Sequence, residues 1–126
     1  MGSDELSENV VRFIADYIDS VPQLEALLLL RDTAPRAWSV EELAARIYVS
    51  PPATQDLANA LERRRLVHRD DAGRFALHCE AADAATLAEV AGTYRRRLPQ
   101  VAGLIHSKAS LGVLEFARAF RLKKEP

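Results

Sequence analysis

Residues 39–77 read SVEELAARIYVSPPATQDLANALERRRLVHRDDAGRFAL, and this stretch predicts two helices joined by a tight turn and followed by a hairpin. Ser39 can cap the first helix, and Glu42 can reach back to the backbone of the cap in a capping-box arrangement. Ser50 can cap the second helix, and Pro51 suits its first position because no N–H donor is needed there. These signals predict where both helices begin.

Apolar residues in both helices recur at spacings of three and four, which predicts one buried face on each. The expected buried residues are Val40, Leu43, Ala44 and Ile47 in the first helix and Ala53, Leu57, Ala60 and Leu61 in the second. Two short apolar runs, at 66–67 and 75–77, flank an Asp/Gly turn at 70–73, which predicts a β-hairpin. The candidate for a short third strand is Ala37–Trp38. A helix-turn-helix followed by a hairpin is a winged helix-turn-helix.

The segments on both sides of this stretch predict further helices. Residues 4–19 show an amphipathic pattern, and residues 23–31 are apolar almost all round, as in a buried helix. Residues 80–107 predict a long amphipathic helix that Pro99 kinks or splits, with a shorter helix after it. The expected fold class is therefore mainly α with a small β-hairpin, a winged helix-turn-helix with extra N- and C-terminal helices.

The chain has 126 residues, a length that suits a single domain. Within it we expect an N-terminal helix at 1–21, a winged-helix core at 22–79 and C-terminal helices at 80–126 for dimerisation or partner docking. We expect neither a signal peptide nor a membrane span, which needs about eighteen consecutive apolar residues. Cys79 is the only cysteine, so no internal disulfide can form, and this predicts a cytoplasmic location.

Residues 38–75, WSVEELAARIYVSPPATQDLANALERRRLVHRDDAGRF, resemble the winged-helix transcription regulators of bacteria, most of all the multiple-antibiotic-resistance-regulator (MarR) type. SVEELAARIYVS is similar to the first helix and turn of that family, and ATQDLANALERRRLV is similar to its recognition helix and the exit into the wing. The resemblance implies double-stranded DNA as the partner and a homodimer held by the terminal helices. Arg65 stands where the family usually has Gly, so either this helix ends differently or Arg65 adopts a left-handed conformation at a cost.

With the predicted apolar face turned inward, the second helix exposes polar side chains that can contact DNA. The expected DNA-binding residues are Ser50, Thr54, Gln55, Asn59, Arg63, Arg69 and Arg74. The first lies beside a phosphate, the next three face base edges in the major groove, and the arginines neutralise phosphates from the helix end and the wing. Residues 1–60 carry a net charge of −6 and residues 61–126 a net charge of +5, which favours one polyanion-facing side.

An alternative use of the same scaffold stays open, which is a non-enzymatic protein-protein interaction adaptor. The predicted exposed face has no cation before Arg63, while Asp56 and Glu62 repel phosphates. The arginines at 63–65 can instead complement the dipole at a helix C-terminus, and those at 95–97 fit a solvated helix face. The C-terminal helices would then hold a protein partner.

No sequence pattern predicts catalysis, a cofactor or a metal site. We find no Gly-rich phosphate loop, no nucleophile elbow and no paired carboxylates suited to acid–base chemistry, so we expect no enzyme. His68, His78 and Cys79 are potential metal ligands. If Arg69 pairs with Arg74 in the hairpin, however, their side chains stay apart, and unrelated histidines are the simpler interpretation.

Apolar stripes continue beyond the winged-helix core at both ends of the chain, and this favours a second copy as a partner. The residues expected at a dimer or partner interface are Val10, Phe13, Tyr17, Leu98, Ile105, Phe116 and Phe120. The alternative is that the terminal helices only cover the core of a monomer.

Overall fold

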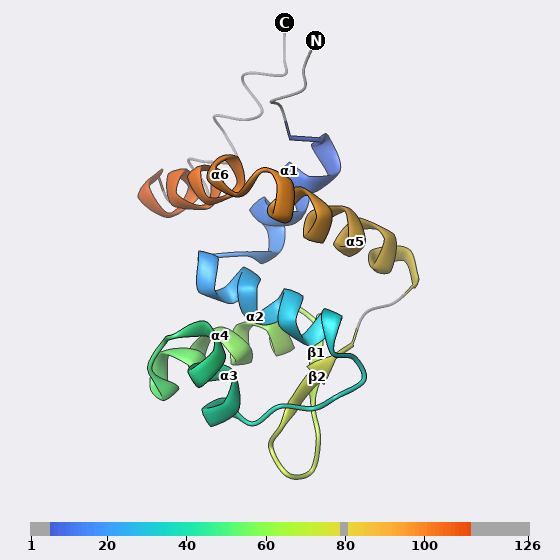
Figure 1. Ribbon diagram of the computed structural model, residues 1–126, viewed down its shortest axis with the longest axis vertical. Coiled ribbons are helices and arrows are strands. Elements are labelled where there is room, and N and C mark those ends of the chain that lie inside the picture. The colour runs from blue at the N-terminus through green and yellow to red at the C-terminus, as the bar shows by residue number, and fades with distance from the viewer. Residues whose placement is uncertain (1–5, 79–80, 112–126) are drawn as a thin grey trace, which may run out of the picture. The chain divides into compact units, whose positions relative to one another are not determined.

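The computed structural model describes residues 6–78 and 81–111, and this part of the chain contains six helices and one two-stranded antiparallel sheet (Figure 1). The elements are, in order, α1 Glu8–Tyr17, α2 Val21–Asp32, α3 Val40–Ile47, α4 Pro51–Arg63, β1 Val67–Arg69, β2 Phe75–Leu77, α5 Ala81–Arg96 and α6 Leu98–Leu111. The predicted fold class, mainly α with a small hairpin, is confirmed. None of the described helices is long and apolar enough to cross a membrane.

The chain divides into two compact units. One is Pro22–Ala84, which holds α3, α4, the hairpin and nearly all of α2. The other consists of the described residues within Met1–Val21 and Ala85–Pro126, which hold α1, most of α5 and α6. The single domain expected over residues 1–126 stays a prediction.

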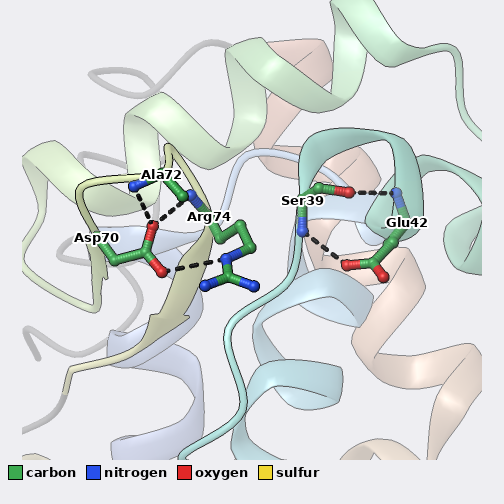
Figure 2. Close-up of polar contacts among 5 residues, drawn as sticks. All are labelled: Ser39, Glu42, Asp70, Ala72 and Arg74. Carbon is green, nitrogen blue, oxygen red and sulfur yellow. Dashed lines mark hydrogen bonds and ion pairs between the residues drawn. The ribbon is translucent and has the colours of Figure 1, made fainter.

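The helix starts predicted in the decisive stretch are confirmed. Ser39 Oγ accepts a hydrogen bond from the Glu42 backbone N–H at 3.1 Å, and the Ser39 N–H donates to Glu42 Oε1 at 2.9 Å, which completes the capping box (Figure 2). Ser50 caps α4 by accepting from the Ala53 N–H, and α4 begins at a proline as expected. Tyr48 ends α3 in the left-handed conformation, with a φ of 59°. The turn between the two helices is therefore fixed at both ends by local signals.

The buried face of α4 differs from the prediction in its first half. Thr54 and Ala58 are buried, whereas Ala53 is exposed and Leu57 is only half-buried. Thr54 and Ala58 lie one turn apart and in line with the buried Leu61, so a strip of mostly small side chains packs toward the core. Hydrophobic periodicity alone favoured Ala53 and Leu57, and that prediction is wrong.

The hairpin is present, but its predicted register is wrong by one residue. Arg69 lies opposite Phe75, not opposite Arg74. The turn explains the shift, because the Asp70 N–H donates to the Arg74 carbonyl at 2.9 Å and the Gly73 N–H donates to the Asp70 carbonyl at 3.0 Å. Gly73 has a φ of 81°, which a glycine adopts without steric cost, so the loop closes between Asp70 and Arg74.

The third strand expected at Trp38 is present as a single bridge to β2. The Trp38 N–H donates to the Phe75 carbonyl at 2.8 Å, and the Phe75 N–H donates to the Trp38 carbonyl at 2.7 Å. The Trp38 indole N–H donates to Thr33 Oγ1 at 2.9 Å, which satisfies the polar atom of this buried side chain. The hairpin is thus fixed to the segment that leads into α3.

In the other unit, α1 and α6 pack together (Figure 1). The predicted split at Pro99 is confirmed, because α5 ends at Arg96 and α6 begins one residue before the proline. Lys108, on α6, is buried, and its ammonium donates to the carbonyl oxygens of Ile14 at 3.0 Å and Ile18 at 2.6 Å. A cation therefore caps the carbonyl end of α1, where the helix dipole favours positive charge.

This packing corrects part of the predicted association surface. Val10, Phe13 and Ile105 are buried within the chain, so they cannot form an exposed interface. Tyr17 is half-buried against the ring of Phe13, and Leu98 is exposed. Amphipathic periodicity marks an inward face but does not say whether the same chain or a second copy covers it. The remaining expected interface residues, Phe116 and Phe120, lie outside the described residues, as does Cys79.

Candidate nucleic-acid interface

The candidate interface is formed by the solvent side of α4, the turn before it and the hairpin. Ser50 is exposed at the N-terminus of α4, and Arg63 is exposed at its last turn. Gln55 and Asn59 lie between these two ends of α4, one helical turn apart, and both are half-buried. Their position agrees with the side of α4 on which the sequence analysis expected polar contacts.

Thr54 must be removed from the predicted set of base-reading residues. Its exposed fraction is 0%, and its Oγ1 has no hydrogen-bond partner in the described part of the structure. Because the side chain faces the core strip of α4, its hydroxyl cannot reach a DNA base. Thr54 was expected on the exposed face because hydrophobic periodicity placed Ala53 and Leu57 on the buried face.

Three of the predicted residues form one hydrogen-bonded group together with Glu62, which we call the amide–arginine network. Gln55 Nε2 donates to Asn59 Oδ1 at 3.0 Å. Arg69 Nη2, from the hairpin, donates to the same Asn59 Oδ1 at 2.6 Å and to Glu62 Oε1 at 2.8 Å. The network therefore ties β1 to two successive turns of α4.

The side chain of Arg69 is held by more than its hydrogen bonds. Its guanidinium carbon lies 4.8 Å from the ring centroid of Phe75, the fully buried residue opposite it in the hairpin. Glu62 compensates part of the charge of Arg69, and the side chains of Glu62 and Arg69 each keep more than a third of their surface exposed. Screening by water limits the energy of this ion pair, so its effect is mainly to orient the guanidinium. The contact between Arg69 and Phe75 could not be predicted from the sequence because it depends on the hairpin register.

The wing turn holds its own cation through Asp70. Asp70 Oδ1 accepts from the backbone N–H groups of Ala72 and Arg74, both at 2.9 Å, and Asp70 Oδ2 accepts from Arg74 Nε at 3.2 Å (Figure 2). The backbone hydrogen bond from Arg74 is the main cause that lowers the pKa of Asp70, and the Ala72 N–H and the Arg74 charge add to it against a desolvation effect that raises it. About half of the Arg74 side chain is exposed, so the tip of the wing presents a guanidinium to solvent.

The end of α4 confirms one of the two alternatives for Arg65. Arg65 adopts the left-handed conformation with a φ of 63°, so it takes the backbone position for which the family uses Gly. The next residue, Leu66, is buried and donates its N–H to the Leu61 carbonyl at 3.0 Å. The left-handed residue thus turns the chain from α4 into β1 while an arginine side chain stays exposed there.

His68 and His78 lie closer together than the predicted register implied. Their ring centroids are 5.6 Å apart in an edge-to-face arrangement, and both side chains are exposed. The register places His68 opposite Ala76, which brings the two rings to the same face of the hairpin. Within residues 6–78 and 81–111, no group of three or more His, Cys, Asp or Glu side chains could hold a metal ion.

Comparison with solved structures gives a likeness to a MarR family protein from Bacillus stearothermophilus. The two chains are 25% identical, the match covers 90% of this chain and 79% of the other, and the TM-score is 0.50. No family model and no curated protein matches the sequence. The likeness supports the MarR-like winged-helix fold that residues 38–75 predicted.

Proposed function

We propose that this chain is a cytoplasmic, dimeric transcriptional regulator that binds duplex DNA through α4 and the hairpin, and that it is no enzyme. The likeness to a MarR family protein supports a winged-helix regulator at the level of the fold. The observation that carries the proposal is the amide–arginine network, because it gathers two amide side chains and a wing arginine on the solvent side of α4. Amides and arginines are the side chains that most often read base edges.

In this proposal α4 enters the major groove, and Gln55 and Asn59 meet base edges there. Ser50, at the N-terminus of α4, lies beside a phosphate, where the N–H groups and the dipole of the helix favour negative charge. Arg63 and Arg74 neutralise phosphates from the end of α4 and from the tip of the wing.

Two copies of the chain would supply two recognition helices, which compensates for a helix that carries few cations. In a two-fold dimer bound to successive half-sites, these helices lie about one DNA turn, roughly 34 Å, apart. Among the expected interface residues, the half-buried Tyr17 and the exposed Leu98 remain candidates within the described part of the chain.

The decisive experiment is selection of duplexes from a random-sequence DNA library by the wild-type chain and by Gln55→Ala. We expect the wild type to select a sequence motif and Gln55→Ala to lose about 1–3 kcal/mol of discrimination while it keeps most of its non-specific affinity. Gln100→Ala, which makes the same substitution at an exposed position of α6, is the matched control. If the wild-type chain binds no duplex even at low salt, the proposal is wrong, and the adaptor alternative becomes the better description.

A further inference from the structure

Asn59 accepts two hydrogen bonds on one oxygen atom, and this decides the orientation of its amide. The two donors are Gln55 Nε2 at 3.0 Å and Arg69 Nη2 at 2.6 Å. A guanidinium has donors but no acceptor, so the Asn59 atom that faces Arg69 must be the carbonyl oxygen and not the NH₂ group. A carbonyl oxygen has two lone pairs, and the two donors occupy both.

The orientation restricts what Asn59 can offer to a DNA base. A free asparagine pairs with adenine by accepting from the adenine N6 amino group and donating to N7. In the network its oxygen is already engaged, so Asn59 presents only N–H donors. Donors alone match the acceptors N7 and O6 of guanine, which is the base edge with two acceptors in the major groove.

The same reasoning fixes the amide of Gln55 in the complementary sense. The Gln55 atom that faces the Asn59 oxygen must be its NH₂ group, because two oxygens would repel each other. One N–H is spent on Asn59, while the Oε1 acceptor and the second N–H remain for a partner. An acceptor next to a donor is the pattern that pairs with adenine.

We propose that Arg69 is a positioning residue for base readout, which fixes Asn59 as a reader of guanine and, through Asn59, fixes Gln55 as a reader of adenine. The inference rests on the proposed function and deepens it by naming the preferred bases. Arg69 can do this because it is itself held by Glu62 and by the ring of Phe75. Its role then differs from that of Arg74, which touches neither amide and contributes charge alone.

The test compares Arg69→Lys and Arg69→Met with Arg74→Met in selection from a random duplex DNA library, with affinity measured over a range of salt concentrations. Lysine keeps the positive charge but is shorter and has no planar guanidinium to lie against the ring of Phe75, so its ammonium is not held where Arg69 Nη2 bonds both Asn59 and Glu62. We expect Arg69→Lys to keep the affinity and salt dependence for random DNA but to lose at least about tenfold in discrimination at the guanine and adenine positions. Arg74→Met should weaken binding to all sequences while it selects the wild-type motif.

A second comparison keeps the test valid if an Arg69 variant does not fold. Asp56→Asn removes one negative charge from the exposed side of α4 outside the amide–arginine network, so it should select the wild-type motif with higher overall affinity. Asn59→Asp keeps the oxygen that Arg69 binds but removes both donors, so it should lose the guanine preference. A wild-type motif without guanine or adenine, or an Arg69→Lys variant that selects an unchanged motif with undiminished discrimination, would overturn the inference while DNA binding stands. Absence of any duplex binding by the wild type would instead overturn the proposed function, and the inference with it.

Discussion

The ammonium of Lys108 lies 2.6 Å from the carbonyl oxygen of Ile18, so a buried charge on α6 caps the end of α1. Asp19, one residue further on, carries the counter-charge, with an oxygen 3.5 Å from the Lys108 nitrogen. A lysine is rarely buried unless its ammonium is paired and hydrogen-bonded, as it is here.

Replacing this lysine should therefore destabilise the protein. Lys108→Met retains most of the apolar stem but removes the donor to the Ile18 carbonyl and one of the two donors to the Ile14 carbonyl, which also accepts the Ile18 N–H at 3.1 Å. We expect a loss of about 1 to 3 kcal/mol in the free energy of unfolding. Urea denaturation measures the change, with His106→Met, at an exposed position of the same helix, as the control. A Lys108→Met variant as stable as the wild type would show that these carbonyls find other donors.

Arg65→Gly should stabilise the protein, in contrast to most substitutions. A non-glycine residue in the left-handed conformation is strained, and glycine removes that strain, so we expect a gain of about 1 kcal/mol. Arg63→Gly is the matched control, because position 63 is helical and glycine there should cost about 0.5 to 1 kcal/mol. Thermal unfolding of both variants compares the two effects, and destabilisation by Arg65→Gly would indicate that the side chain makes a contact worth more than the strain.

The wing should contribute charge to DNA binding in a way that does not depend on sequence. We expect Arg74→Ala to weaken binding to all duplexes and to reduce the slope of log affinity against log salt by about 0.9, the value for one phosphate contact. Fluorescence anisotropy with labelled duplexes at several salt concentrations measures both quantities. Arg12→Ala, which removes an exposed arginine from α1, is the control for net charge. Unchanged affinity and slope for Arg74→Ala would exclude the wing tip from the interface.

The acid side of the stability profile should depend on Asp70. Its pKa is lowered in the folded state, chiefly by the backbone hydrogen bond from Arg74, so the unfolded chain takes up a proton first as the pH falls. The stabilisation is therefore complete above the ordinary aspartate pKa of about 4 and is lost as the pH falls through the lower folded value. We expect Asp70→Asn to lower the melting temperature at pH 7 and to approach the wild type near pH 2. Asp71→Asn makes the same substitution at the next position of the turn, outside these hydrogen bonds, and is the control.

Association should occur in dilute solution. We expect the wild type to sediment as a dimer at tens of micromolar, and we expect Leu98→Asp to weaken the dimer because Leu98 is an exposed apolar side chain on α6. Phe116→Asp and Phe120→Asp test the part of the predicted surface that lies outside the described residues. Circular dichroism of each variant checks that the helices remain folded. A monomeric wild type would contradict the predicted homodimer.

Local signals predicted most of the fold. The capping box at Ser39, the proline at the start of α4 and the split at Pro99 each depend on residues close in sequence, and the structure confirms all three. The strained Arg65 was one of two alternatives left open from a single departure from the family pattern. Such features can be predicted because each is decided by the backbone chemistry of one turn.

The candidate site was less predictable, because it depends on how elements pack. Thr54 was assigned to the exposed face because hydrophobic periodicity turned Ala53 and Leu57 inward, whereas the structure buries Thr54 completely. The predicted hairpin register was wrong by one residue, and for this reason the hydrogen bond between Arg69 and Asn59 was not predicted. An error of one residue in the buried face of a helix or in the register of a strand changes the direction of every side chain on that element.

The amide–arginine network also has a consequence for the entropy of binding. A long side chain that becomes immobilised only on contact with a partner loses rotamer freedom, at a cost of about 0.5 to 1.5 kcal/mol. Gln55, Asn59 and Arg69 are held by one another and by Glu62 within the folded chain, so folding has already restricted them. When a partner binds this face, these side chains lose less rotamer freedom, so a larger part of the contact energy contributes to the affinity.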